Sequence, residues 1–122
     1  MSESIVRSRI FASAWSRSGN FIRLKSANGT MTKSAWPPSD AYGQTRLCLE
    51  IITKALADLG ARPEDVVRTR VYGTRTDIFD DVARAHSEVF SEIQPASAFV
   101  VIKELANPAW LVEIEADAIV TA

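Results

Sequence analysis

The chain has few of the residues and patterns from which several kinds of functional site are built. Cys48 is its one cysteine and His86 its one histidine. A single cysteine excludes a disulfide within the chain, and one cysteine with one histidine cannot form a Cys/His zinc site in one chain. No phosphate-binding glycine loop, dinucleotide fingerprint or HExxH pattern occurs in the 122 residues. These absences remove the usual signatures of nucleotide and zinc sites.

The chain also has no surplus of charge of one sign. Its 14 basic and 15 acidic residues give a net charge of −1, so we expect neither a nucleic-acid partner nor attraction to an anionic membrane. The longest apolar runs fall far short of the roughly 18–20 residues that span a bilayer. The segment "MSESIVRSRIF" lacks the layout of a signal peptide. Together with the single cysteine, these features predict a cytoplasmic protein.

What is present is an ordinary globular composition, with 47% hydrophobic and 24% charged residues. The length predicts one domain over residues 1–122. Periodicity and turn residues predict strands and helices in the order strand, helix, strand, helix, strand, strand. The expected bounds are a strand at Gly19–Ala27, a helix at Ala41–Leu59, a strand at Glu64–Thr74, a helix at Ile78–Phe90, and strands at Ala98–Lys103 and Trp110–Ile119.

Local residues predict how these elements begin, end and pack. Ser39 or Asp40 is expected to cap the first helix and Gly60 to end it, and Thr76 or Asp77 is expected to cap the second. The residues expected to be apolar contacts are Leu47, Ile51, Ile52, Ala55, Leu56 and Leu59 in the first helix, Phe79, Val82, Ala85, His86 and Val89 in the second, and Val67, Thr69 and Val71 on one strand face.

The order of elements predicts an α+β fold in which two helices pack on one face of a mixed sheet. The last two strands, "FVVIKEL" and "LVEIEADAIV", hold more apolar side chains than two helices are expected to cover. We therefore expect a homo-oligomer, with the remaining apolar surface buried between subunits.

Charged residues on strands are the first candidates for chemistry. Glu113 and Glu115 are two apart and therefore point the same way, with Ile114 opposite. A carboxylate there can hold a water and exchange protons with it, but the solvated polar face of an amphipathic strand is the commoner origin of this pattern. Arg23 and Lys25 share one strand face and can attract a carboxylate ligand, although surface charge is the commoner role of such residues.

Other candidates have ordinary structural explanations. His86 lies within the apolar repeat of the second helix, which predicts a half-buried, hydrogen-bonded side chain. Cys48 lies beside the apolar stripe of the first helix and is expected in the core. Trp15 and Trp110 are each suited to line an apolar pocket or to pack in the core or an interface.

Three segments together resemble the Rid (YjgF/RidA, reactive intermediate deaminase) family. They are "YGQTRLCLEIITKALADLGARPEDVVRTRVY", "EVFSEIQPASAFVVIKEL" and "LVEIEADAIV". They are similar to that family's Gln-Thr/Ala-Arg helix and following strand, its Pro-Ala-Arg-Ser segment and its closing Val/Ile-Glu-Ile-Glu-Ala strand. The resemblance runs from about Gly19 to the C-terminus.

The resemblance implies a chorismate-mutase-like α+β fold assembled as a homotrimer. In such a trimer the sheets form an inner barrel, the helices face outward, and three clefts between subunits bind small molecules. Deaminating members hydrolyse enamine or imine intermediates to a 2-oxo acid and ammonia without a metal or cofactor. Because an imine carbon is already electrophilic, the protein needs only to fix the substrate and position a water.

The resemblance also assigns site residues and marks departures. In deaminating members the arginine of Pro-Ala-Arg-Ser grips the substrate carboxylate, and its counterpart here is Ser97, in "PASA". A serine hydroxyl donates one neutral hydrogen bond, whereas a guanidinium makes a charged two-pronged contact. Phe99 stands where a cysteine is common, and Glu113 matches the water-holding glutamate. The remaining counterparts are Lys25 and Ser26, near the family's Ser-Gly, and Trp15, at an early aromatic position.

Two functional hypotheses remain open. The first is an imine or enamine hydrolase acting on a substrate other than 2-iminobutanoate, with Glu113 positioning water and Arg23 or Lys25 replacing the arginine. The second is a protein that binds a small, more apolar ligand in the same cleft without turnover. A ribonuclease, an activity attached to this family by name, is disfavoured by the net charge and the single histidine.

Overall fold

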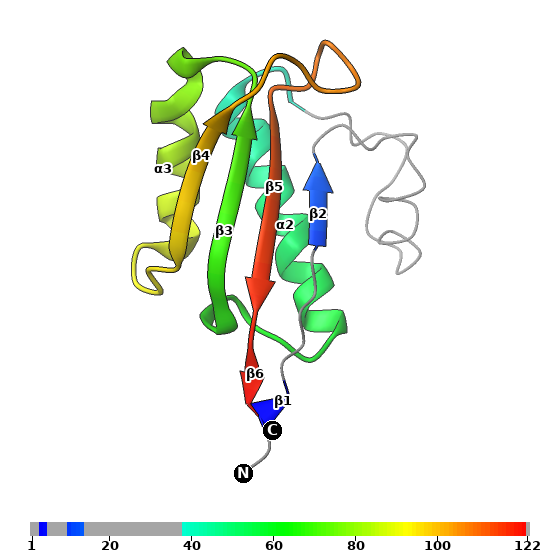
Figure 1. The fold of residues 1–122 in the computed structure, drawn as a ribbon, viewed down its shortest axis with the longest axis vertical. Coiled ribbons are helices and arrows are strands. Elements are labelled where there is room, and N and C mark those ends of the chain that lie inside the picture. Colours follow the sequence, from blue (N-terminus) through cyan, green and yellow to red (C-terminus); the bar gives the residue numbers. More distant parts are fainter. Residues whose placement is uncertain (1–2, 5–9, 14–37, 122) are drawn as a thin grey trace.

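The computed structural model describes residues 3–4, 10–13 and 38–121 (Figure 1). Its elements are β1 (Glu3–Ser4), β2 (Ile10–Ser13), α2 (Ala41–Asp58), β3 (Val66–Gly73), α3 (Phe79–Phe90), β4 (Ala96–Val101), β5 (Val112–Ala118) and β6 (Val120–Thr121), with short 3₁₀ turns at Pro63–Asp65 and Thr76–Ile78. The expected strand at Gly19–Ala27 lies outside the described residues.

Four strands form a mixed sheet in the order β2-β5-β3-β4. β3 and β4 are parallel and are joined through α3, whereas β5 is antiparallel to both of its neighbours. β1 and β6 make a separate antiparallel pair. Both helices lie on the same face of the sheet (Figure 1). The predicted α+β architecture, with two helices on one face of a mixed sheet, is confirmed.

Alternation along β5 separates the two faces of the sheet. Val112, Ile114 and Ala116 have no exposed surface and pack in the core, whereas Glu113 and Glu115 are half-buried on the opposite face. The predicted orientation of the two glutamates is therefore confirmed. The helices of the same chain cover the apolar side chains of β5, whereas Ile119, in the same predicted segment, is 38% exposed.

The edge strand β4 carries exposed apolar side chains. Val100 is 41% exposed and Val101 is 47% exposed, and only Phe99 of the six residues of β4 is as much as half-buried. An exposed edge with apolar side chains and unpaired backbone groups is unusual in a monomer, because it invites pairing with another chain. This edge therefore carries two neighbouring exposed apolar side chains, while the other large exposed apolar side chains of the described residues lie on other segments, at Leu59, Val67, Phe79 and Ile119.

The ends of α2 follow the predicted capping chemistry. The Asp40 carboxylate accepts a hydrogen bond from the Gly43 N–H at 2.9 Å, and Gly60 has a φ of +80° just beyond the last turn. The Ala61 N–H donates to the Leu56 carbonyl at 2.8 Å, which satisfies a carbonyl that the helix leaves free. Leu59, expected in the apolar stripe, is exposed because it lies beyond the last helical turn.

Three further local expectations are wrong. The turn Thr76–Ile78 precedes α3, so neither Thr76 nor Asp77 caps that helix by its side chain. Phe79 starts the helix and is exposed. Val67 also points away from the core, because the pairing of β3 with β5 shifts register between Val66 and Arg68 and buries Val66 instead. A bulge of this kind inserts one extra residue and reverses the expected facing.

A buried glutamine joins the start of α2 to the loop before β5. Gln44 is 1% exposed, and its amide nitrogen donates to the carbonyls of Pro38 and Ala109 at 2.8 and 3.0 Å. Its amide oxygen accepts from the Leu111 N–H at 2.8 Å. One side chain thus satisfies three backbone groups from two segments that are distant in the sequence.

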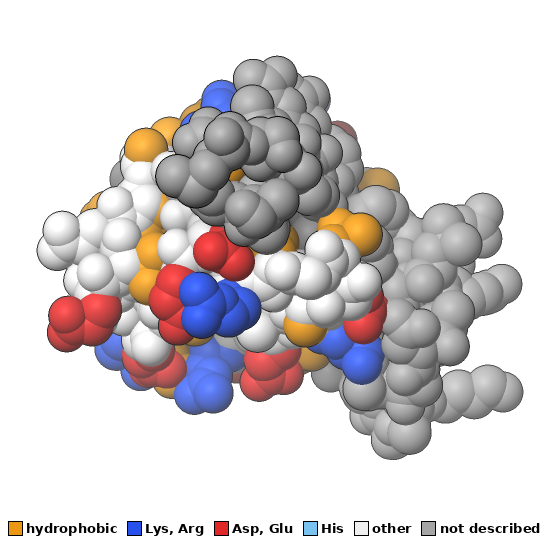
Figure 2. Space-filling view, turned by 90° about the horizontal axis from the view of Figure 1, so that it is seen from below, with side chains coloured by type: hydrophobic (Ala, Val, Ile, Leu, Met, Phe, Trp, Pro, Cys, Tyr) orange, Lys and Arg blue, Asp and Glu red, His pale blue; other side chains and the backbone are white. Residues whose placement is uncertain are grey.

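The charged side chains of the described surface are interspersed by sign. The end of the molecule seen in Figure 2 carries acidic and basic side chains side by side. Arg68 pairs with Asp117 at 2.8 Å, and Arg62 approaches Asp65 at 4.0 Å. This distribution gives no broad positive field on that end of the described chain.

Gln44→Leu is expected to lower the free energy of unfolding by about 2–4 kcal/mol, because three backbone groups lose their partner in a buried site. Urea denaturation measures the loss. The matched control is Gln94→Leu, the same exchange at an exposed position, which should change the free energy by less than about 0.5 kcal/mol. Equal effects at the two positions would contradict the role assigned to Gln44.

Candidate functional site

Thr69 links two polar side chains that are each distant from it in the sequence. It lies on the helix-covered face of β3, is 1% exposed, and its hydroxyl oxygen is 2.8 Å from His86 Nε2 and 2.8 Å from Ser97 Oγ. The parallel register pairs Thr69 with Ser97, so both side chains leave the sheet on the same side. The buried hydroxyl therefore joins α3 to the edge strand β4.

His86 forms the inner end of this hydrogen-bonded chain. It is half-buried, as predicted from its place in the apolar repeat, and its ring lies 4.8 Å from that of Phe90, centroid to centroid. Burial lowers the pKa of His86 from its ordinary value of 6.5, because desolvation disfavours the charged form. At neutral pH the imidazole is therefore uncharged.

A cavity of about 240 Å³ opens beside this chain, between α3 and β4. Its polar lining is His86, Ser87 and Ser97. Its remaining lining is apolar and comprises Val71, Phe79, Val82, Ala83, Ala98 and Phe99. Among the described residues that line it there is no Lys, Arg, Asp or Glu. The cavity therefore suits a small ligand with an apolar body and one or two hydrogen-bonding groups.

Phe99 forms one wall of the cavity because Gly73 leaves room for it. A Cβ at Gly73 would lie 2.5 Å from Phe99 Cζ, closer than side chains approach in real structures. The Phe99 ring also meets Phe79 edge to face, with 5.3 Å between centroids, a favourable aromatic geometry. Phe99 therefore lines the cavity with a bulky, apolar ring.

Glu113 lies on the other face of the sheet, two strands away from Ser97. It is half-buried beside Glu115, and burial, together with the charge of Glu115, raises its pKa above the ordinary value of 4.5. A carboxylate with a raised pKa is better suited to exchange protons near neutral pH. The structure of one chain does not bring this carboxylate into the cavity that holds Ser97 and Phe99.

The predicted site residues thus divide into three groups. Ser97 and Phe99 lie together at the cavity, and Glu113 lies apart from them. Trp15, Arg23, Lys25 and Ser26 lie outside the described residues. Cys48 is fully buried and Trp110 is 7% exposed, so the expected core position of Cys48 is confirmed and Trp110 is packed rather than open to solvent.

The sequence pattern predicts a hydrogen-bonded His86, and the structure shows its partner to be Thr69. Sequence reasoning missed this partner, because it places Thr69 only on the packed face of a strand. The available signal was a hydroxyl side chain at a buried strand position between valines, in "VVRTRVY". Because a buried hydroxyl needs a hydrogen-bond partner, a threonine at such a position indicates that another polar group lies close to it.

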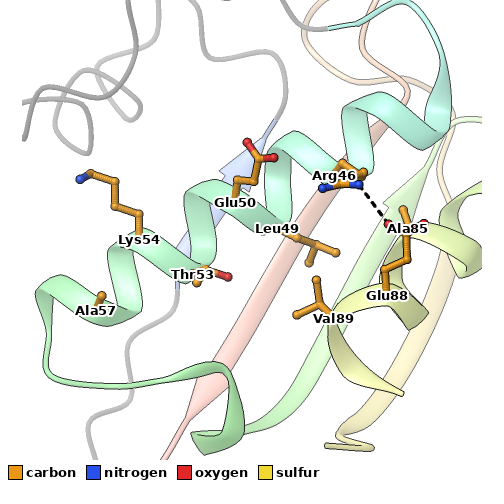
Figure 3. Close-up of a pocket in the computed structure, with 9 residues that line it drawn as sticks. All are labelled: Arg46, Leu49, Glu50, Thr53, Lys54, Ala57, Ala85, Glu88 and Val89. Carbon is orange, nitrogen blue, oxygen red and sulfur yellow. Dashed lines mark hydrogen bonds and ion pairs between the residues drawn. The ribbon is translucent and has the colours of Figure 1, made fainter. Parts of the chain in front are cut away.

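A larger groove, of about 390 Å³, runs between α2 and α3 on the outer side of the helices. Figure 3 shows Leu49 and Val89 pointing toward one another across it. Two of its charged side chains are engaged with each other, since Glu88 pairs with Arg46 at 3.2 Å and accepts a hydrogen bond from the Tyr42 hydroxyl at 2.6 Å. We treat this groove as the seam of helix packing, and the smaller cavity beside Ser97 as the candidate site.

Two features of other functional classes are absent from the described part of the chain. No three His, Cys, Asp or Glu side chains are grouped there so that they could hold a metal ion. No helix in that part is long and apolar enough to cross a membrane.

Comparison with known proteins identifies the family. The family model described as Endoribonuclease L-PSP matches residues 4–120. The chain belongs to this family. It is the family also called YjgF or Rid, so the resemblance of the three sequence segments is confirmed.

Solved structures and a curated relative agree with this assignment. A YjgF/YER057c/UK114 family member from Mycobacterium tuberculosis is 42% identical with a TM-score of 0.67, covering 68% of this chain and 70% of that one. A putative endoribonuclease from Thermotoga maritima is 26% identical, also with a TM-score of 0.67, over 75% and 73% of the two chains. An uncharacterized protein of Streptomyces coelicolor is 28% identical over 127 residues, 97% of this chain and 95% of the relative.

Within this Rid-family chain, the raised pKa of Glu113 predicts a pH-dependent stability. Because the folded state binds the Glu113 proton more tightly than the unfolded state does, stability falls as pH rises from about 4.5 through the raised pKa. Glu113→Gln removes this charge, so it should make the protein more stable than wild type at about pH 7 and give little difference at about pH 4. Urea denaturation at both pH values measures this.

The control for this prediction is Asp117→Asn, on the same strand and the same face. It removes the ion pair with Arg68 and is expected to lower stability at about pH 7. A Glu113→Gln protein that is less stable than wild type at about pH 7 would show that Glu113 is held by favourable contacts rather than destabilised by its surroundings.

Proposed function

We propose that the chain forms a homotrimer whose clefts between subunits bind a small carbonyl- or imine-type metabolite, at a subsite beside Ser97 that favours uncharged groups at neutral pH. The observation that carries this proposal is the lining of the cavity beside Ser97. It offers hydroxyl and imidazole groups and two aromatic rings, and the described residues add no charge to it. Such a lining favours an uncharged polar group over a carboxylate, since the described lining offers a carboxylate no partner of opposite charge to offset its loss of hydration.

The trimer is supported by the exposed edge of the sheet. β4 has no strand on its outer side among the described residues, and its apolar side chains Val100 and Val101 are exposed. In the family arrangement, the helix-free faces of three sheets line an inner barrel and the helices lie outside. The half-buried charges Arg68, Glu115 and Asp117 would then belong to the barrel side.

The site residues of the proposal come from the cavity and from the family resemblance. Ser97 and Phe99 line the subsite for the polar group and its apolar neighbour. Trp15, Arg23, Lys25 and Ser26 complete the binding surface in this proposal. The ligand is a small molecule, the protein needs no cofactor, and its location is cytoplasmic.

Hydrolysis of an imine or enamine is a second candidate function, favoured by the properties of Glu113. A half-buried carboxylate with a raised pKa is suited to hold a water and to accept a proton from it. Within one chain Glu113 and Ser97 are on opposite faces of the sheet. This candidate therefore requires that the two residues of one cleft come from different subunits.

The first test combines assembly with ligand choice. Light scattering should give a mass three times the 13.4 kDa of the chain. Val100→Lys should reduce that mass because it adds a charge to the exposed edge, whereas Leu59→Lys, at a similarly exposed position just beyond the end of α2, should leave it unchanged. A wild-type monomer would refute the trimer and its clefts.

Ligand choice is measured with two aromatic ketones of similar shape, isobutyrophenone and benzoylformate, of which only the second carries a carboxylate. At about pH 7.5 the neutral ketone should bind wild type more tightly. Ser97→Arg should reverse the preference and raise benzoylformate affinity by about ten- to a hundredfold, since a charge-assisted contact contributes about 1.5–3 kcal/mol. Tighter binding of benzoylformate by wild type at this pH would refute the preference for an uncharged group.

The second candidate is tested with two imines generated in the assay, one by an amino acid oxidase and one, without a carboxylate, by an amine oxidase. Faster release of the carbonyl product than in buffer from either imine supports hydrolysis, and Glu113→Gln should reduce the rate by about 100-fold or more. Glu115→Gln, on the same strand and face, is the matched control and should retain most of the rate. Release no faster than in buffer would leave binding as the function.

A further inference from the structure

The hydroxyl of Thr69 has one proton and two close neighbours. The single proton links the hydrogen-bonding role of one neighbour, as donor or acceptor, to that of the other. The hydroxyl oxygen is 2.8 Å from His86 Nε2 and 2.8 Å from Ser97 Oγ, so the hydroxyl can donate to only one of them. Because Thr69 is 1% exposed and a buried hydroxyl proton is seldom left without an acceptor, it donates to one neighbour and accepts from the other. If Nε2 accepts from Thr69, Ser97 donates to Thr69 and offers only lone pairs to a ligand. If Nε2 carries a proton, it donates to Thr69, Thr69 donates to Ser97, and the Ser97 proton becomes available to a ligand.

Protonation of His86 removes this choice. An imidazolium has a proton on both ring nitrogens and can only donate. The chain of hydrogen bonds then runs in one direction, and Ser97 presents a donor to the cavity. In the same state the cavity wall gains a positive charge, because His86 itself lines the cavity.

We propose that His86 is the specificity-determining residue of this cavity, which in its protonated form selects ligands that carry a carboxylate next to a carbonyl group. It acts through its own charge and, by way of Thr69, through the hydroxyl of Ser97. This inference rests on the proposed function, since it concerns the same subsite. It adds that the preference for uncharged ligands holds only while His86 is neutral and reverses when the residue is protonated.

The other charged side chains near His86 in the described chain do not face the cavity and so do not select a carboxylate. The described neighbours of His86 on β3 and β4, among them Thr69, Val71, Ser97 and Phe99, carry no charge. On α3, Arg84 lies over the Tyr42 ring and Glu88 pairs with Arg46, both toward α2, and Asp80 and Asp81 are exposed in the first turn. On β3, Arg68 and Arg70 alternate with Thr69 and therefore lie on the opposite face of the sheet.

The burial of His86 agrees with this selection. Desolvation is the cause that lowers the pKa of His86, so a carboxylate that enters the cavity restores a favourable partner for the imidazolium. Ligand binding and proton uptake are then thermodynamically linked, and each must strengthen the other. The apolar part of the ligand contacts Phe99 and Phe79, the two rings on the remaining wall.

The test measures the affinity of the wild-type protein for benzoylformate and isobutyrophenone by calorimetry between about pH 5 and pH 8. Benzoylformate remains ionised throughout this range. Its affinity should fall by more than about tenfold from pH 5 to pH 7.5, whereas that of isobutyrophenone should change by less than about threefold. His86→Gln keeps an N–H that can donate to Thr69 but has no charge at any pH, and it should abolish the pH dependence for benzoylformate.

Two variants at Thr69 separate the hydrogen-bonded chain from simple packing. Thr69→Ser keeps the hydroxyl and should keep the benzoylformate affinity measured at about pH 5, whereas Thr69→Val should lower it. Equal losses in the two variants would overturn the part of the proposal that acts through Thr69.

A second measurement needs no variant. Because His86 is the only histidine, its ring signals in an NMR titration are unambiguous. Saturating benzoylformate should raise the pKa of His86, and isobutyrophenone should not. If isobutyrophenone binds but benzoylformate affinity is independent of pH, the inference about His86 fails and the proposed function stands. If neither probe binds at any pH, both fail.

Discussion

The alternation of buried and half-buried residues along β5 and β3 is the constraint on which the arrangement of polar groups depends. Val112, Ile114 and Ala116 must face the helices because they are the apolar side of β5, and this forces Glu113 and Glu115 onto the other face. The same rule on β3 turns Thr69 toward α3 and the arginines away from it. The two candidate chemistries of the chain, the hydroxyl–imidazole chain and the carboxylate pair, are therefore separated by the thickness of the sheet.

Two buried polar side chains connect the elements that this alternation arranges. Gln44 joins the start of α2 to the segment before β5, and Thr69 joins β3 to α3 and β4. The side-chain polar atoms of Gln44 and Thr69 lie within hydrogen-bonding distance of their partners, so neither residue leaves an unpaired polar group in the core. Each therefore favours this one arrangement of the elements that it joins. Gln44 belongs to the segment that carries the family resemblance, and its three backbone contacts give a structural reason for a glutamine at that point.

Much of this fold follows from local patterns. The Asp40 cap, the left-handed Gly60 and the facing of Glu113 depend on residues within one turn or one strand, and all three were predictable. The bulge at Val67 was not, because it depends on the partner strand β5. The exposed positions of Leu59 and Phe79 depend on where each helix begins or ends, which apolar periodicity defines only to within a residue or two.

The candidate site was predictable only in part. Ser97 and Phe99 were singled out from the resemblance, and the structure brings them to one cavity. Their connection to His86 was not foreseen, because Thr69 is 17 residues from His86 and 28 residues from Ser97 in the sequence. Hydrogen bonds over such separations depend on strand register and on the crossing of α3, and neither can be read from the spacing of residue types.

The contact between Gly73 and Phe99 has a consequence for how relatives of this protein diverge. The ring of Phe99 packs against the backbone of Gly73, where the Cβ of any other residue would clash with it. A change at position 73 would push that ring toward the cavity and alter the size of molecule accepted, while all the residues that touch the molecule stay the same. Two relatives with identical cavity linings can therefore differ in ligand size because of a residue that never meets the ligand.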